Sequence, residues 1–215
     1  MSIAGNINKI KKEISETATL VAVSKTKPNE AIQEAYDFGQ RIFGENKVQE
    51  LVQKYEDLPK DIEWHLIGHL QTNKVKYIAP FVCMIHAVDS MKLLKEINKQ
   101  ASKNNRVIDC LIQVKIAEEE SKFGLSKNET EDILNSNEIK QLTNIQIVGF
   151  MGMATNSSDE TQVKEEFSSL HTFFKQHTEL SILSMGMSGD YKIAIKEGSN
   201  MIRVGSTIFG GRNYT

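Results

Sequence analysis

The stretch "TLVAVSKTKPNEAIQEAYDFGQRIFGE", residues 19–45, contains the patterns of a strand, a helix and a second strand. Residues 19–25 begin with a continuous apolar run, which is typical of a strand buried on both faces. Residues 28–39 start with a proline and end on a glycine, as helices often do, and residues 41–45 predict the next strand. Because a helical crossover joins parallel strands, this stretch predicts a βαβ unit.

The same alternation continues to the end of the chain. Further strand patterns cover residues 63–68, 84–89, 110–116, 145–153, 181–186 and 201–208. Helical patterns cover residues 90–103, with Ser90 expected as the N-cap, and residues 159–177, while residues 2–15 predict an additional helix. Eight alternations predict an α/β fold, a single-domain (β/α)8 TIM barrel over residues 1–215. The alternative is a doubly wound open sheet, but its GxGxxG fingerprint is absent after the first strand.

Composition narrows the class of protein. The 215 residues carry a formal net charge of −2, which gives no reason to expect a nucleic-acid or anionic-membrane partner. No apolar run approaches the roughly 20 residues that span a bilayer, and the N-terminus has no secretory h-region, so a cytoplasmic protein is expected. Cys83 and Cys110 lack metal-ligand spacing and are expected as reduced core thiols, and no metal site is predicted.

Lys25 lies where the first apolar run ends, and the carboxyl ends of barrel strands carry the chemistry. Partial burial disfavours the ammonium and leaves a fraction of nucleophilic amine, which condenses with an aldehyde to a Schiff base. The structural alternative is a surface lysine beside Lys27.

Two late segments favour a phosphate site. "MGMSGD" (185–190) places Ser188 and Gly189 at the start of an expected helix, and "RVGST" (203–207) places Gly205 and Ser206 at a strand end. Small residues let backbone N–H groups approach a phosphate, and barrels often bind phosphate after strands seven and eight. The alternative is a pair of tight turns that need glycine.

Arg203 lies within an apolar strand pattern and shares a face with Gly205. An inward arginine needs a carboxylate, a phosphate or a ring nitrogen, and the alternative is a buried structural salt bridge. His65 is expected either to stack on a planar ligand or to be a core histidine, and Trp64 is expected in the core. A lysine, a phosphate cradle and an arginine are the groups needed to hold pyridoxal 5′-phosphate (PLP).

Six segments carry a resemblance to a known family. They are "LVAVSKTKP" (20–28), "FGENKVQE" (43–50), "WHLIGHLQTNK" (64–74), "LIQVKIAEEESKFG" (111–124), "LSMGMSGD" (183–190) and "EGSNMIRVGSTIFGGRNY" (197–214). With these segments the sequence resembles the pyridoxal phosphate homeostasis protein family, whose members look like the barrel domain of alanine racemase standing alone.

The resemblance implies a PLP-binding barrel that holds the cofactor as an internal aldimine on Lys25. It implies that Asn46 lies beside the cofactor, that Ser188, Gly205 and Ser206 bind the phosphate, and that Arg203 faces the pyridine nitrogen. An arginine there would leave the nitrogen largely unprotonated and weaken the ring as an electron sink, as suits a carrier.

Four positions depart from the family pattern. His69 stands where proline is usual, Lys115 where asparagine is common, Phe123 where a small or polar residue is usual, and Gly189 where aspartate is frequent. These departures leave any partner or amino-acid preference open.

The leading hypothesis is a monomeric, non-catalytic protein of PLP homeostasis that hands PLP to apoenzymes and buffers amino- or keto-acid pools. One alternative is an amino-acid racemase, which needs a second base that the absent second domain would supply, so no substantial racemase activity is expected. Another alternative is a Schiff-base aldolase that acts on a sugar phosphate. The reactive lysines of such aldolases commonly lie on later strands, whereas Lys25 lies on the first. The third is a scaffold with PLP as a stabilising passenger.

Overall fold

Eight parallel strands form a closed barrel in chain order, because each strand pairs with the next and β8 pairs with β1. The computed structural model describes residues 2–14, 18–117 and 123–211. The strands are β1 (Thr19–Val23), β2 (Ile42–Glu45), β3 (Glu63–Leu66), β4 (Met84–Val88), β5 (Ile108–Gln113), β6 (Ile145–Met151), β7 (Ile182–Ser184) and β8 (Met201–Val204). The predicted (β/α)8 barrel is confirmed.

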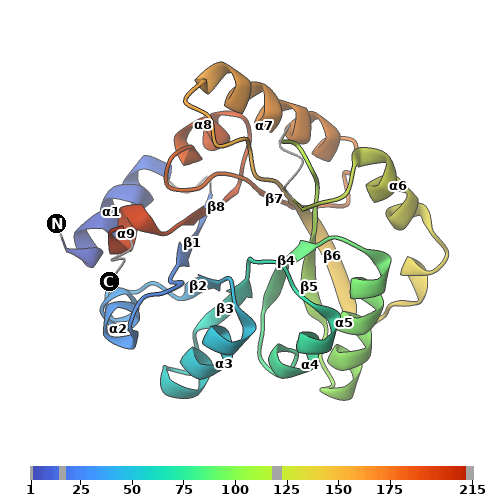
Figure 1. The fold of residues 1–215 in the computed structure, drawn as a ribbon, viewed down its shortest axis with the longest axis horizontal. Helices are drawn as coiled ribbons and strands as arrows, with labels where there is room; N and C mark the ends of the chain where they lie inside the picture. The colour runs from blue at the N-terminus through green and yellow to red at the C-terminus, as the bar shows by residue number, and fades with distance from the viewer. Residues whose placement is uncertain (1, 15–17, 118–122, 212–215) are drawn as a thin grey trace.

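Helices surround the barrel, as Figure 1 shows. They are α1 (Ile3–Ile14), α2 (Asn29–Asp37), α3 (Val48–Asp57), α4 (Val75–Ile78), α5 (Met91–Lys103), α6 (Lys127–Asn135), α7 (Glu160–Phe174), α8 (Tyr191–Lys196) and α9 (Ser206–Phe209), with short 3₁₀ turns η2 (Thr72–Lys74) and η3 (Ile139–Gln141). The predicted additional N-terminal helix is α1, and residue 15 of its expected range lies outside the described residues. Ser90 caps α5 as predicted, since its hydroxyl accepts a hydrogen bond from the backbone N–H of Leu93.

Strand alternation separates two cores. Side chains on the outer face of the barrel pack against the helices, and Trp64 is fully buried there against Phe43 with a ring separation of 5.9 Å. The inner face carries a smaller apolar cluster that includes Val21, Leu111 and Met151. This inner cluster fills the barrel interior below the carboxyl ends of the strands.

Strands β1 and β8 end earlier than their sequence patterns predict. Their ladder stops at the pair of Ala22 with Val204, so the chain is free to turn beyond these residues. The prediction of strand through residue 208 was wrong: the chain turns at Gly205 and forms α9. The residues after the two strands therefore become loops at the mouth of the barrel.

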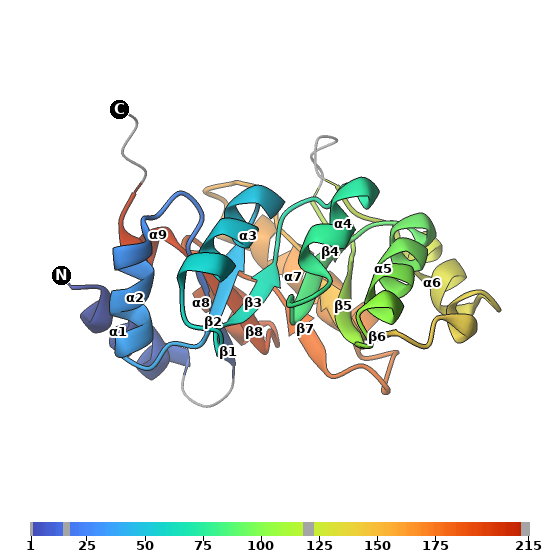
Figure 2. The same ribbon diagram turned by 90° about the horizontal axis from the view of Figure 1, so that it is seen from below.

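Helices α1 and α9 lie side by side at one edge of the barrel (Figures 1 and 2). Ile7, Ile10 and Ile14 form the buried face of α1, and the side-chain amide of Asn6 donates to the carbonyl of Ile208 at 2.9 Å. The additional helix thus supports the segment that follows β8.

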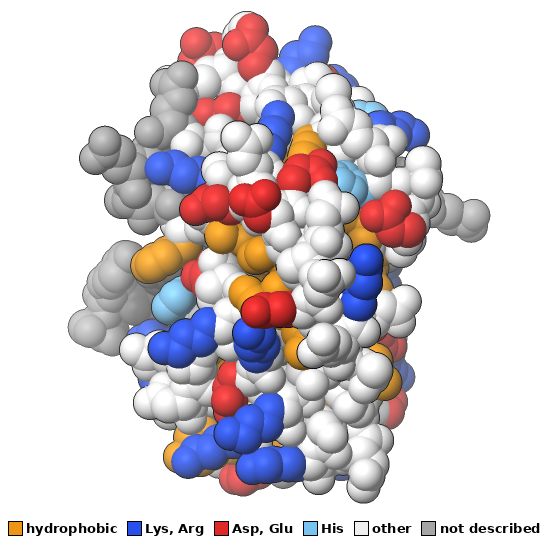
Figure 3. Space-filling model, turned by 90° about the vertical axis from the view of Figure 1, so that its right-hand side faces the viewer, with side chains coloured by type: hydrophobic (Ala, Val, Ile, Leu, Met, Phe, Trp, Pro, Cys, Tyr) orange, Lys and Arg blue, Asp and Glu red, His pale blue; other side chains and the backbone are white. Residues whose placement is uncertain are grey.

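Acidic and basic side chains both occur on the face shown in Figure 3, which is the right-hand side of Figure 1, with hydrophobic ones between them. Cys110 is buried and Cys83 is partly buried, both as free thiols. Among the described residues, no helix is long and apolar enough to cross a membrane.

Candidate functional site

A pocket of about 370 Å³ lies at the carboxyl ends of the strands, within the usual size of small-molecule sites. It brings together six of the seven predicted site residues. The lining comprises Val23, Lys25, Thr26, Lys27, Asn46, Ile67, Met153, Met187, Ser188, Gly189, Arg203, Gly205, Ser206 and Gly210. His65 is the predicted site residue that this lining does not include.

Lys25 occupies a tight turn directly after β1. The backbone N–H of Lys27 donates to the carbonyl of Ser24 at 3.0 Å, which makes Lys25 and Thr26 the two central residues. Thr26 has a φ of 62°, a region that favours glycine and is strained for a β-branched residue. The lysine is therefore presented to the pocket by an unusual backbone conformation.

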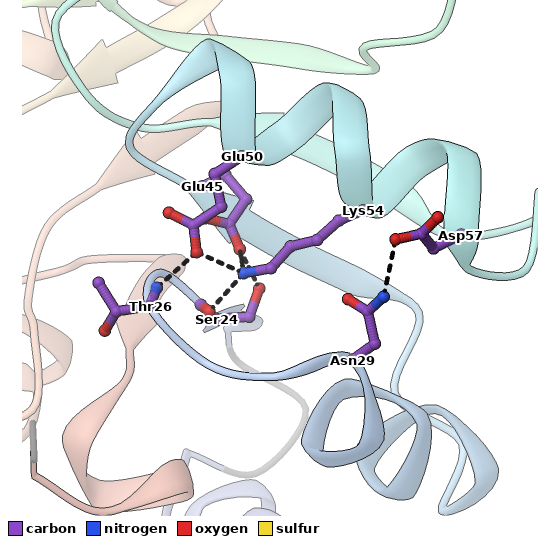
Figure 4. Close-up of polar contacts among 7 residues, drawn as sticks. All are labelled: Ser24, Thr26, Asn29, Glu45, Glu50, Lys54 and Asp57. Carbon is purple, nitrogen blue, oxygen red and sulfur yellow. Dashed lines mark hydrogen bonds and ion pairs between the residues drawn. The ribbon is translucent and has the colours of Figure 1, made fainter.

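A polar network lies behind this turn, between the barrel and α3 (Figure 4). The ammonium of Lys54 donates to the carbonyl of Ser24 at 2.8 Å and to carboxylate oxygens of Glu45 and Glu50, each at 2.7 Å. Glu45 also accepts from the hydroxyl of Ser24 at 2.6 Å, and Glu50 accepts from the backbone N–H of Thr26 at 2.6 Å. Burial raises the pKa of Glu45, although Lys54 and Ser24 act in the opposite direction.

Arg203 points into the barrel and is only 3% exposed. Its guanidinium donates to the carbonyl of Ser184 at 2.9 Å, to the Ser184 hydroxyl at 2.6 Å and to the carbonyl of Gly152 at 3.0 Å. Burial lowers the pKa of Arg203 to about 10, so the group stays charged at neutral pH. These contacts fix the plane of the guanidinium at the floor of the pocket.

His65 belongs to a buried chain beneath the pocket. Its Nδ1 lies 3.0 Å from Nε2 of His86, and Nδ1 of His86 lies 3.3 Å from the hydroxyl of Ser184. Burial lowers the pKa of His65 to about 4 and holds the pKa of His86 well below its ordinary value, so both rings are neutral at pH 7. His65 is thus a core histidine satisfied by another side chain, and it reaches Arg203 through His86 and Ser184.

The two predicted phosphate segments meet at Ser188. Its hydroxyl oxygen accepts from the backbone N–H groups of Gly205 at 3.2 Å and Thr207 at 3.4 Å. A Cβ on Gly205 would lie 3.0 Å from the carbonyl of Val23, which explains the glycine there. The expected helix after this segment begins at Tyr191, three positions beyond Ser188. These contacts bring Ser188 and Gly205 together on the wall of the pocket.

Lys27 closes the other side of the pocket. Its ammonium donates to the carbonyls of Phe209, Gly210 and Gly211 at 3.1, 3.0 and 2.9 Å. The second lysine of the "SKTK" sequence therefore holds the segment after α9 against the β1 turn.

Three of the four departures from the family pattern lie outside the pocket lining. His69 stacks on Phe123 with a ring separation of 4.6 Å, and its Nδ1 lies 3.2 Å from the carboxylate of Asp89. Lys115 also lies outside the lining, and Gly189 lines the pocket. Within the described residues, no three His, Cys, Asp or Glu side chains are grouped to hold a metal ion.

Comparison with known proteins identifies one family. The family model of the alanine racemase N-terminal domain matches residues 1–213. A pyridoxal phosphate homeostasis protein from Aquifex aeolicus is 40% identical over 203 residues, which cover 92% of this chain and 88% of that protein. The chain belongs to the pyridoxal phosphate homeostasis protein family.

Two solved structures contain a similar barrel, one as the whole protein and one as part of a larger enzyme. PipY from Synechococcus elongatus, solved with PLP bound, is 34% identical with a TM-score of 0.88, and the match covers 97% of this chain and all of PipY. An alanine racemase from Clostridium difficile has a TM-score of 0.80 at 12% identity, and the match covers 57% of that enzyme. The second similarity is one of fold.

Proposed function

We propose that this chain binds PLP in the pocket at the barrel mouth and acts in PLP homeostasis. The observation that carries the proposal is the convergence of Lys25, Arg203, Ser188, Gly205 and Ser206 on one pocket of about 370 Å³. The donor set suits the ligand: an amine for the aldehyde, N–H and hydroxyl groups for the phosphate, and a buried guanidinium for the ring nitrogen. PipY, a relative of similar length, was solved with PLP bound.

In this proposal each residue has a separate task. Lys25 holds the aldehyde carbon as a Schiff base, and Asn46 lies beside the ring. Ser188, Gly205 and Ser206 bind the phosphate. Arg203 donates to the pyridine nitrogen and leaves it without a proton of its own, and His65 supports Arg203 from below through the buried chain.

The pocket supports storage and transfer of PLP over catalysis. Racemisation requires a base on each side of the cofactor. Among the described lining residues, the second amine that could act as a base is that of Lys27. It already donates to three backbone carbonyls. We therefore propose a single PLP-binding domain over residues 1–215 that works as a monomer in the cytoplasm, supplies PLP-dependent apoenzymes and has no substantial enzymatic activity.

Absorption spectroscopy followed by borohydride reduction tests the proposal. PLP is added to the purified protein, the visible band of the Schiff base is recorded, and the reduced protein is mapped by peptide mass spectrometry. The phosphopyridoxyl mass is expected on Lys25 and is expected to disappear in Lys25→Ala. A colourless protein, or label on other lysines only, contradicts the proposal. Proton exchange of L-alanine in deuterated water, measured by NMR, tests the absence of racemase chemistry.

A further inference from the structure

The backbone around Lys25 is held from outside the pocket. Thr26 keeps its positive φ of 62° although threonine disfavours this region. Such conformations persist where surrounding contacts hold them, and they often occur at functional sites. The contacts that hold Thr26 therefore bear on the position of the lysine beside it.

Those contacts come from one face of α3. Glu50 accepts from the N–H of Thr26 at 2.6 Å, and Lys54, one turn later on α3, donates to the carbonyl of Ser24 at 2.8 Å. The two helix residues also pair with each other at 2.7 Å. The residues on both sides of Lys25 are therefore fixed by one ion pair, which Glu45 extends into the barrel wall (Figure 4).

We propose that Glu50 and Lys54 are positioning residues that hold the turn at Lys25 in the conformation required for covalent capture of PLP. This inference rests on the proposed function. Neither residue is among those that line the pocket, so they act through the backbone of Ser24 and Thr26.

The chemistry explains why the turn must be fixed. The neutral amine of Lys25 adds to the aldehyde carbon, a C=N bond forms, and the aldehyde oxygen leaves as water. The amine must reach that carbon while the phosphate and ring are already held by other elements, so a rotated turn weakens the covalent step alone. Binding of pyridoxine 5′-phosphate, which has an alcohol in place of the aldehyde, needs no such reach.

The experiment compares Glu50→Ala with Asp57→Ala. Asp57 lies on the same helix and accepts from the amide of Asn29 at 2.9 Å, but it does not contact the turn. We expect Glu50→Ala to weaken PLP binding about tenfold or more and to slow Schiff-base formation, with an unchanged affinity for pyridoxine 5′-phosphate. The control variant is expected to bind both ligands like the unaltered protein.

A rescue experiment separates positioning from general loss of structure. Glycine adopts positive φ without strain, so Thr26→Gly added to Glu50→Ala should recover most of the lost PLP affinity. Glu50→Gln, which keeps an acceptor for the N–H of Thr26, serves as a milder variant and should lose less affinity. Equal weakening of both ligands, or a Glu50→Ala variant that behaves like the control, overturns the inference. Failure of the unaltered protein to form a Schiff base overturns the proposed function as well, so the two failures are distinguishable.

Discussion

Nε2 of His86 lies 3.0 Å from Nδ1 of His65, and both rings are buried beneath the candidate PLP pocket. Because a guanidinium can only donate, the Ser184 hydroxyl accepts from Arg203. The same hydroxyl lies 3.3 Å from Nδ1 of His86, so a buried chain of polar contacts runs from Arg203 through Ser184 and His86 to His65.

The buried histidines predict a pH dependence of stability. Their pKa values are lowered in the folded protein, to about 4 for His65, whereas the unfolded chain binds protons below about pH 6.5. Stability is therefore fully present above pH 6.5 and falls as the pH drops toward 4, by about 1.4 kcal/mol per pH unit for each histidine fully protonated only in the unfolded state. Urea unfolding between pH 7 and 5 measures this, and His86→Gln should lose less stability over the range. If the unfolding free energy of His86→Gln falls with pH as steeply as that of the unaltered protein, His86 is not the source of the pH dependence.

Ser184 joins the histidine pair to Arg203, so its removal should cost both stability and PLP affinity. Ser184→Ala removes the hydroxyl contact of Nδ1 of His86, at a cost of about 1–3 kcal/mol, and it removes one of the three contacts that hold the guanidinium of Arg203. Urea unfolding and PLP titration measure the two effects. Ser102→Ala, an exposed serine on α5, is the control and should change stability by at most about 0.5 kcal/mol. Equal stability of both variants would show that the buried contacts of the Ser184 hydroxyl contribute nothing to the free energy of unfolding.

Much of the barrel and part of the site follow from sequence patterns. Eight apolar runs alternating with helical patterns suffice for the fold, because parallel strands buried on both faces carry a distinct period. Lys25, Gly205 and Ser206 were predicted because they lie where such runs end, Arg203 because it interrupts one, and Asn46 from the family resemblance. The structure brings these residues into one pocket.

The supporting residues could not be predicted in the same way. His86 lies inside an apolar strand pattern, where a lone histidine carries little information until the barrel closes and sets it against His65 and Ser184. Glu50 and Lys54 look like an ordinary exposed i,i+4 pair on an amphipathic helix. Their role depends on a backbone turn that only the tertiary structure places against α3.

Gly68 should control the position of Asn46 without entering the pocket. A Cβ at Gly68 would lie 2.5 Å from the backbone carbonyl oxygen of Asn46, so Gly68→Ala must displace Asn46. We expect a loss of about 1–3 kcal/mol in unfolding free energy and weaker PLP binding. Gly189→Ala is the matched control, because a Cβ there meets nothing within 4 Å although the residue lines the pocket. If Gly189→Ala lowers PLP affinity more than Gly68→Ala does, the position of Asn46 is not what Gly68 controls.

Lys27 should support the PLP site without itself reacting with PLP. Its ammonium holds the carbonyl of Phe209, the last residue of α9, and the two carbonyls that follow it. In the proposed function this helix begins at the phosphate-binding residue Ser206. Lys27→Met removes these charge-assisted hydrogen bonds and should weaken PLP binding about tenfold, equivalent to about 1.4 kcal/mol. Borohydride should still fix PLP on Lys25 in this variant, as peptide mass mapping can show.

The control for Lys27 is another lysine that holds helix carbonyls. Lys60 donates to the carbonyls of Tyr55 and Glu56 in α3, away from the pocket, so Lys60→Met should leave PLP affinity unchanged. If Lys27→Met abolishes labelling of Lys25 even at saturating PLP, Lys27 takes part in the covalent step, because loss of a supporting contact would lower affinity and leave the attachment site the same. If both variants bind PLP like the unaltered protein, the segment after α9 holds its position through α1 instead, where Asn6 contacts Ile208.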